Sequence, residues 1–284
     1  MANYPGAGLR LRTDLHTHST YSDGFYSPEE LCRRAKANGV KLLSVTDHDT
    51  MNGEEEKRAA AEKYAIRYVS GWEISAYAGE SKIHVTGYGC RRNEAYLSFM
   101  RERRELGFER AEDSIRKLRQ AGIYLTLEDA KARRADPDSP VHTMHIAGAA
   151  AAVTGKTPGE IYEEYLAPGR LAHSSVGRPT PEQAIDCIHA SGGIASVAHP
   201  GRITLPFGER EEMIARLVRY GADGIEAVYT THTVEETEYF RSLAEKFGLL
   251  VTGGSDTHVE EDCHRIGFPV FFPDERLLSA LGIV

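Results

Sequence analysis

The chain has 284 residues, a formal net charge of −8 and 41% hydrophobic residues, the balance of a soluble globular protein with one or two domains. The negative charge argues against a duplex-DNA binder that works by neutralising phosphates. The sequence has four isolated cysteines and no stretch resembling a secretory signal or membrane span, so a reduced, cytoplasmic protein without a membrane partner is expected.

Helix and strand signals alternate over the first ninety residues. Ser27-Pro28-Glu29-Glu30 is a capping box with proline at the first helical position, and it predicts a helix that ends near Asn38-Gly39. Further elements are predicted at 40–46 (strand), 52–64 (helix), 66–71 (strand) and 82–88 (strand).

The middle of the chain has only helical signals. Residues 94–120 are highly charged, with apolar residues spaced as in a long amphipathic helix. Shorter helices are predicted at 127–134, 142–153 and 158–166. We therefore interpret residues 93–177 as a helical insertion that forms part of the substrate pocket, and 1–92 with 178–284 as the core around it.

The alternation resumes after this insertion. Thr180-Pro181-Glu182-Gln183 caps a helix through Ala190, and Thr233 caps another through Phe247. Strands are predicted at 193–198, 224–229 and 249–254. Repeated strand–helix units with polar residues at the strand ends predict an α/β barrel or barrel-like sheet, whose active site lies at that end.

Nine candidate metal ligands fall in short clusters, five of which are predicted at strand-to-loop junctions. Residues two apart on a strand point the same way, so each His-x-His or Asp-x-His pair can bind one ion. The nine are six histidines and three carboxylates: His16, His18, Asp23, His48, Glu73, His84, His199, Asp256 and His258.

This ligand set is too large for a single ion, so it predicts a polynuclear site. Imidazole and carboxylate without thiolate suit manganese, iron or zinc. Three divalent ions would bring a charge of about +6 against about −3 from the carboxylates, and such a positive cleft favours a phosphate-bearing substrate. Each cluster alone has an ordinary alternative, such as a turn or a loop carboxylate, but their combination favours metal binding.

Several motifs, in order along nearly the whole chain, resemble the PHP (polymerase and histidinol phosphatase) family, in particular its YciV/TrpH-like branch. They are Asp14-Leu15-His16-Thr17-His18-Ser19, Ser22-Asp23-Gly24, Thr46-Asp47-His48-Asp49, Gly71-Trp72-Glu73-Ile74, His84, Ala198-His199-Pro200-Gly201 and Gly254-Ser255-Asp256-Thr257-His258. The resemblance implies a distorted (β/α)7 TIM-like barrel with a helical insertion, and activity on nucleotide phosphates or oligonucleotide 5′ ends.

The resemblance also implies a ligand assignment with two or three divalent ions. His16, His18 and Asp256 would hold one ion, and Glu73 would bridge it to a second. His84 and His199 would complete the second site, and Asp23, His48 and His258 would hold a third ion. The nucleophile would be a metal-bridging hydroxide, so no covalent intermediate is expected.

Four further residues are candidates for substrate contact. Arg202 matches a position where this branch often has arginine, and it is a candidate phosphate clamp. His145 resembles an element of the branch's insertion and is a candidate phosphate ligand or general acid, although Thr143 stands where the branch has arginine. Arg178 is a candidate replacement for that missing charge, and His232 is either a substrate contact or a capping-loop residue.

The expected function is metal-dependent hydrolysis of a phosphate ester of a nucleotide, of the AMP or 3′,5′-bisphosphate type, or of an oligonucleotide 5′ end. Histidinol-phosphatase-like activity, an amidohydrolase that cleaves C–N bonds, and a non-catalytic metal-stabilised binding module are the alternatives. No heptad or apolar patch predicts an oligomeric state.

Overall fold

The computed structural model describes residues 11–79, 81–134, 141–259 and 265–283. The chain divides into two compact units, Met1–Tyr96 with Thr180–Val284, and Leu97–Pro179. Cys32, Cys90 and Cys187 are buried thiols outside any disulfide, as expected, and Cys263 lies outside the described residues. Within the described residues, no helix combines the length and the apolar character needed to cross a membrane.

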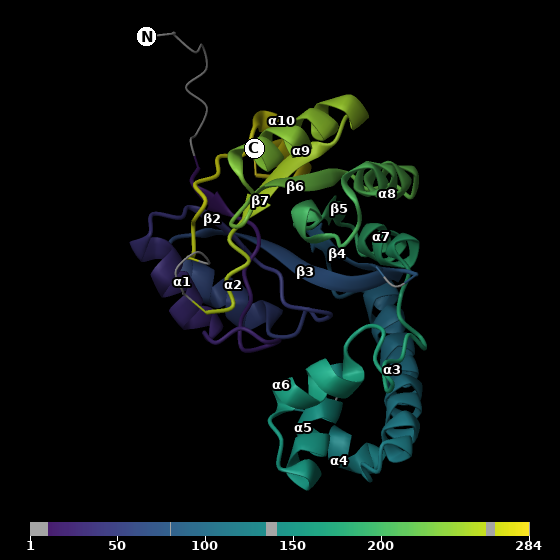
Figure 1. The fold of residues 1–284 in the computed structure, drawn as a ribbon. Coiled ribbons are helices and arrows are strands. Elements are labelled where there is room, and N and C mark those ends of the chain that lie inside the picture. The colour runs from purple at the N-terminus through teal and green to yellow at the C-terminus, as the bar shows by residue number, and fades with distance from the viewer. Residues whose placement is uncertain (1–10, 80, 135–140, 260–264, 284) are drawn as a thin grey trace. The chain divides into compact units, whose positions relative to one another are not determined.

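The first unit contains a seven-stranded sheet in chain order (Figure 1). Its strands are β1 (Thr13–Asp14), β2 (Leu42–Val45), β3 (Arg67–Ala78), β4 (Ser81–Tyr88), β5 (Ile194–Val197), β6 (Gly224–Tyr229) and β7 (Leu250–Gly254). The backbone N–H of Leu15 donates to the carbonyl of Gly253 at 3.1 Å, which brings β1 beside β7. The predicted distorted seven-stranded α/β barrel is confirmed.

Strand direction changes in the middle of the sheet. β1, β2 and β3 are parallel, β4 is antiparallel to both β3 and β5, and β5, β6 and β7 are parallel again. β3 pairs with β2 through Ser70 and then continues with β4 as its partner from Gly71. The prediction of a strand that ends at residue 71 is therefore wrong, because a second partner keeps the chain extended to Ala78.

The helices of the first unit are α1 (Pro28–Ala37), α2 (Glu54–Lys63), α7 (Pro181–Ala190), α8 (Phe207–Arg219), α9 (Val234–Phe247) and α10 (Glu275–Ala280). The side chains of Ser27, Thr180 and Thr233 accept hydrogen bonds from the backbone at the starts of α1, α7 and α9, as their motifs predict. A single 3₁₀ turn, Pro200–Arg202, follows β5.

The core of this unit follows the alternation of side chains along each strand. In β2, Leu43 packs with Leu31 of α1, whereas Leu42 packs with Val69 and Val228 from other strands. All four residues of β2 are buried, as expected for a strand covered on both faces.

The second unit is helical, with its own hydrophobic core. It contains most of α3 (Glu94–Gln120), then α4 (Leu127–Lys131), α5 (Thr143–Thr154), α6 (Pro158–Ile161) and a π-helical turn (Tyr162–Leu166). Ile115, Leu118 and Ile146 are among the residues that form this core. The bounds of this unit differ by a few residues from the predicted insertion at 93–177, and the insertion's part in a substrate pocket stays a prediction.

Candidate metal centre

Two of the predicted ligand pairs lie side by side just beyond β1 and β7. The N–H of Asp256 donates to the carbonyl of His16 at 2.7 Å, and the N–H of His18 donates to the carbonyl of Thr257 at 2.9 Å. A Cβ atom added to Gly254 would lie 2.4 Å from the His16 Cβ, so the two segments approach as closely as glycine allows. The Nε2 atoms of His16 and His18 lie 3.5 and 3.0 Å from Asp256 Oδ1.

The Glu73 carboxylate lies among five imidazoles. Its Oε1 is 3.4 Å from His16 Nε2, 2.8 Å from His84 Nδ1 and 3.0 Å from His199 Nε2. Its Oε2 is 3.5 Å from His18 Nε2 and 2.9 Å from His48 Nδ1. Glu73 and His84 lie within β3 and β4 rather than at strand ends, because the antiparallel pairing of these strands extends past them.

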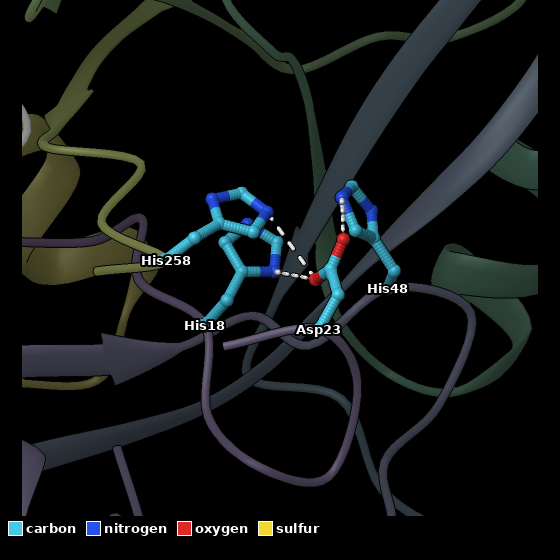
Figure 2. Close-up of side chains that lie close together, drawn as sticks. All are labelled: His18, Asp23, His48 and His258. Carbon is cyan, nitrogen blue, oxygen red and sulfur yellow. Dashed lines mark ion pairs between the residues drawn. The ribbon is translucent and has the colours of Figure 1, made fainter. Parts of the chain in front are cut away.

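Asp23 lies between His48 on one side and His18 and His258 on the other (Figure 2). Its carboxylate oxygens are 3.2 Å from His258 Nε2, 3.8 Å from His48 Nε2 and 3.9 Å from His18 Nδ1. The rings of His18 and His258 are stacked, with centroids 4.1 Å apart. The Asp23 side chain is 58% exposed, so this part of the cluster is open to solvent.

Among the residues that the structure describes, candidate ligand atoms that lie within 4.8 Å of one another form three overlapping groups, named here by one member each. Each pair of groups shares one residue. The Asp23 group is His18, Asp23, His48 and His258; the Asp256 group is His16, His18, Glu73 and Asp256; the His84 group is His48, Glu73 and His84. His199 is in none of these groups, although its Nε2 is 3.1 Å from His84 Nδ1.

The cluster fits divalent metal ions because its ligand atoms lack other partners. Six buried atoms in the described part of the chain have no hydrogen-bond partner and belong to these groups: His16 Nε2, His18 Nδ1 and Nε2, His48 Nδ1, Glu73 Oε2 and Asp256 Oδ1. Buried polar atoms are normally hydrogen-bonded, so such a set in one place indicates ligands for a cation.

The protonation states of these side chains also fit the binding of divalent metal ions. Burial alone would raise the pKa values of Glu73 and Asp256, but the adjacent histidines lower both well below the usual range. Burial, together with His48, lowers the pKa of His18 to about 4. Burial opposes protonation of His48, yet Glu73 outweighs it and raises the pKa of His48 to about 9. A metal ion would compete with that proton for the same position.

Backbone strain is concentrated at this cluster. Among the described residues, positive φ angles occur at four non-glycine positions, and three of these are Asp49 (52°), His199 (28°) and Asp256 (52°). Such conformations cost free energy and persist where surrounding contacts impose them, often at functional sites.

Sequence reasoning missed three residues that hold the candidate ligands in place. Both oxygens of Glu226, in β6, lie 3.1 Å from His16 Nδ1, and its Oε2 also accepts from the backbone N–H of His199. The hydroxyl of Tyr229 donates to Asp256 Oδ2 at 2.8 Å. Asp47 accepts three hydrogen bonds from residues next to ligands. A carboxylate within a buried strand was the available signal for Glu226.

Arg202 lies beside the cluster. Its Nη1 donates to Asp256 Oδ2 at 3.2 Å and to the Tyr229 hydroxyl at 3.1 Å, while its side chain is 56% exposed. His232 lies nearby, and its Nε2 accepts from the Gly201 N–H while its Nδ1 lies 3.1 Å from the Ala227 carbonyl. His232 therefore links β6 to the turn that carries Arg202, and a substrate contact by His232 stays a prediction.

The remaining two predicted substrate residues, His145 and Arg178, belong to the second unit. His145 Nδ1 accepts a hydrogen bond from the backbone N–H of His142 at 3.0 Å, and Arg178 Nε donates to the Ser174 carbonyl at 3.0 Å. Burial lowers the pKa of His145 to about 4, so its ring is neutral near pH 7 with its proton on Nε2. Substrate contact by either residue stays a prediction.

Comparisons with known proteins agree on one family. The PHP domain family matches residues 14–133. A 5′-3′ exoribonuclease of Haemophilus influenzae is 34% identical over 88% of this chain and 91% of its own length. A 3′,5′-nucleoside bisphosphate phosphatase of Chromobacterium violaceum is 32% identical over 86% of each chain. A solved structure from the same species, described as an amidohydrolase with bound sulfate and no metal, is 30% identical with a TM-score of 0.78, covering 95% of this chain and 97% of that one.

The fold, the ligand cluster and these similarities place the chain in the PHP family. The chain is a metal-dependent phosphoric ester hydrolase of that family.

Proposed function

We propose that the chain hydrolyses phosphate monoesters of nucleotides, of the AMP or 3′,5′-bisphosphate type, or acts on the 5′ ends of short oligonucleotides. The observation that carries this proposal is the convergence of six buried, unpartnered ligand atoms next to the partly exposed guanidinium of Arg202. The names of the relatives, an exoribonuclease and a nucleoside bisphosphate phosphatase, support a nucleotide as the substrate.

The nine predicted residues would hold two or three divalent ions, of manganese, iron or zinc. Such ions lower the pKa of bound water and neutralise charge on a phosphoryl group. Glu73 would contribute to two of the three groups, and the strained turns at His199 and Asp256 would fix the directions of their side chains. The cluster as a whole would select a small anionic substrate, because ions in excess of the three carboxylates leave a positive charge.

Arg202 would bind the substrate phosphate. One of its nitrogens is held by Asp256 Oδ2 and the Tyr229 hydroxyl, which fixes the guanidinium at the edge of the cluster. The planar guanidinium has further N–H donors in a fork that matches phosphate oxygens. The arginine would therefore orient the phosphate toward the ligand groups without becoming a ligand itself.

The decisive experiment is a substrate panel on protein that has been stripped of metal and reconstituted with manganese. The panel contains 5′-AMP, 3′,5′-bisphosphoadenosine, histidinol phosphate and a short 5′-phosphorylated RNA, and released phosphate or nucleotide is measured. Turnover of a nucleotide or RNA in preference to histidinol phosphate is the expected result. Turnover of histidinol phosphate alone would overturn the proposed substrate class.

Glu73→Gln tests the centre of the site. The substitution keeps the shape of the side chain but removes the charge shared by the Asp256 and His84 groups. We expect kcat to fall by roughly a thousandfold, on the order of 4 kcal/mol in the barrier. Glu245→Gln, an exposed position in α9, is the matched control. Normal hydrolysis of 5′-AMP by Glu73→Gln would contradict the assigned role.

Arg202→Lys tests the phosphate clamp. Lysine keeps the positive charge but loses the fork, so we expect KM for the nucleotide to rise about tenfold, with a smaller change in kcat. Steady-state kinetics with 5′-AMP or the bisphosphate measure both constants. An unchanged KM would remove Arg202 from the binding site.

A second candidate function is hydrolysis of a C–N bond, because the similar Chromobacterium violaceum structure is described as an amidohydrolase. Parallel assays on phosphate esters and cyclic amides with the same manganese-loaded protein separate the two. The phosphate ester is favoured, because the curated relatives are named for phosphate-ester and RNA hydrolysis.

A further inference from the structure

A buried carboxylate that is not itself in any ligand group holds the loop on which Asp23 lies. Asp47 Oδ1 accepts from the backbone N–H of Ser19 at 2.7 Å and from the Ser22 hydroxyl at 2.6 Å, and Oδ2 accepts from the Ser19 hydroxyl at 2.7 Å. Asp47 is fully buried.

The positions of these partners connect Asp47 to most of the Asp23 group. Ser19 follows His18 in the chain, Ser22 precedes Asp23, and Asp47 itself precedes His48. The carbonyl of Asp47 also accepts the backbone N–H of Glu73 at 3.2 Å. One residue therefore fixes the backbone next to three members of the Asp23 group and next to Glu73.

The charge of Asp47 is balanced by Lys57 of α2. Lys57 Nζ lies 2.5 Å from Asp47 Oδ2, and the lysine side chain is fully buried. Burying an ion pair costs desolvation free energy that its attraction often fails to recover, so such a pair is weak evidence for stability. The pair lies beside residues 19–23, the loop that carries Asp23 and is called the ligand loop below. A role in positioning that loop fits this location better than a role in stability.

The start of α2 also packs against the ligand loop. A Cβ atom at Gly53, which has a φ of 72°, would lie 2.1 Å from the ring of Tyr21. The Tyr21 hydroxyl donates to Glu56 at 2.6 Å, and Lys57 Nζ lies 5.5 Å from the centre of its ring. The loop is thus held at Tyr21 from outside and at Ser19 and Ser22 from inside.

We propose that the buried Asp47–Lys57 pair is a positioning device for metal binding at the Asp23 group, the ligand set at the open edge of the site. Asp23 is exposed and lies on a loop, so its carboxylate depends on this anchor to meet His18, His48 and His258. The ligands of the Asp256 group are held by other contacts, including those of Glu226. Loss of the Asp47 carboxylate therefore weakens the Asp23 group more than the Asp256 group, with which it shares His18. This inference rests on the metal site of the proposed function.

The experiment measures Mn²⁺ binding to the full chain by calorimetry, after metal removal, and does not depend on a substrate. Asp23→Ala defines the loss caused by removing a ligand of the Asp23 group. Asp47→Asn, which keeps the size of the side chain, is expected to reproduce that loss, with affinity at the corresponding site about tenfold to a hundredfold weaker. Glu226→Gln is the matched control, and its effect is expected at the Asp256 group instead.

The double variant Asp47→Asn/Lys57→Met separates positioning from stability. It removes the unpaired ammonium, so its resistance to urea is expected to recover relative to Asp47→Asn, while the loss of Mn²⁺ binding persists. Mn²⁺ binding by Asp47→Asn like that of the wild type, or its recovery in the double variant, would overturn the inference. If the wild type itself binds no Mn²⁺, the proposed function fails together with this inference. If the wild type binds Mn²⁺ and Asp47→Asn binds it equally well, only this inference fails.

Discussion

The site contains two kinds of residue, the candidate ligands and the side chains that orient them. The contact between Glu226 and His16 Nδ1 orients the ring so that its Nε2 faces Glu73 and Asp256. Because Glu226 also accepts from the His199 backbone, it holds two ligand-bearing segments together.

Glu226→Gln tests a side chain of the second kind. Glutamine keeps one acceptor oxygen but loses the negative charge, and it replaces the second oxygen beside His16 Nδ1 with an amide NH₂ that cannot accept. We expect metal affinity or kcat to fall by roughly 10–100-fold. Mn²⁺ titration and nucleotide hydrolysis measure the two effects, and values within twofold of the wild type would exclude an orienting role.

At the scale of elements, capping motifs predicted the starts of three helices, whereas two other helices were not predicted. α1, α7 and α9 begin at Ser27, Thr180 and Thr233, as their sequences indicate. The N-cap of α8 is Pro206, which has no side-chain hydrogen bond to offer, and α10 has only six residues, so neither was predicted.

The ends of the predicted strands located much of the candidate site, because parallel strands place the residues that follow them at one edge of a barrel. The antiparallel pairing of β3 with β4 lies outside that rule, because alternation within a strand carries no information about the direction of its partner. Glu226 was missed because its partner His16 is 210 residues away in the sequence.

His145, in helix α5, leads to a prediction about how the free energy of unfolding depends on pH. His145 has a pKa lowered to about 4 by burial and by neighbouring positive charge, against about 6.5 in an unfolded chain. Between these values the unfolded chain binds a proton that the folded chain does not. The free energy of unfolding therefore falls as the pH drops from about 6.5 to 4, by at most about 3 kcal/mol.

An NMR titration of the His145 ring measures this directly, with His145→Gln used to assign its signal. The midpoint is expected near 4, and stability at pH 5 should fall less in His145→Gln than in the wild type. A midpoint near 6.5 would show that the ring is not shielded from solvent.

At the scale of the whole molecule, the candidate ligands come from distant parts of the chain, between His16 and His258. An ion held by the folded chain stabilises it by mass action, about 2.7 kcal/mol at a concentration one hundred times its dissociation constant. Removal of metal with a chelator is therefore expected to lower Tm by several degrees, and added Mn²⁺ should restore it. Calorimetric scans without any such change would speak against metal binding in the folded state.

The overlap of the three ligand groups has a thermodynamic consequence. His18, Glu73 and His48 each serve two groups, so an ion in one group alters the free energy of occupying its neighbours. Such linkage is reciprocal, because the factor by which the first ion changes the affinity of the second equals the factor by which the second changes the affinity of the first. Successive ions are then not independent, and a titration curve would be cooperative or anticooperative rather than a sum of separate isotherms.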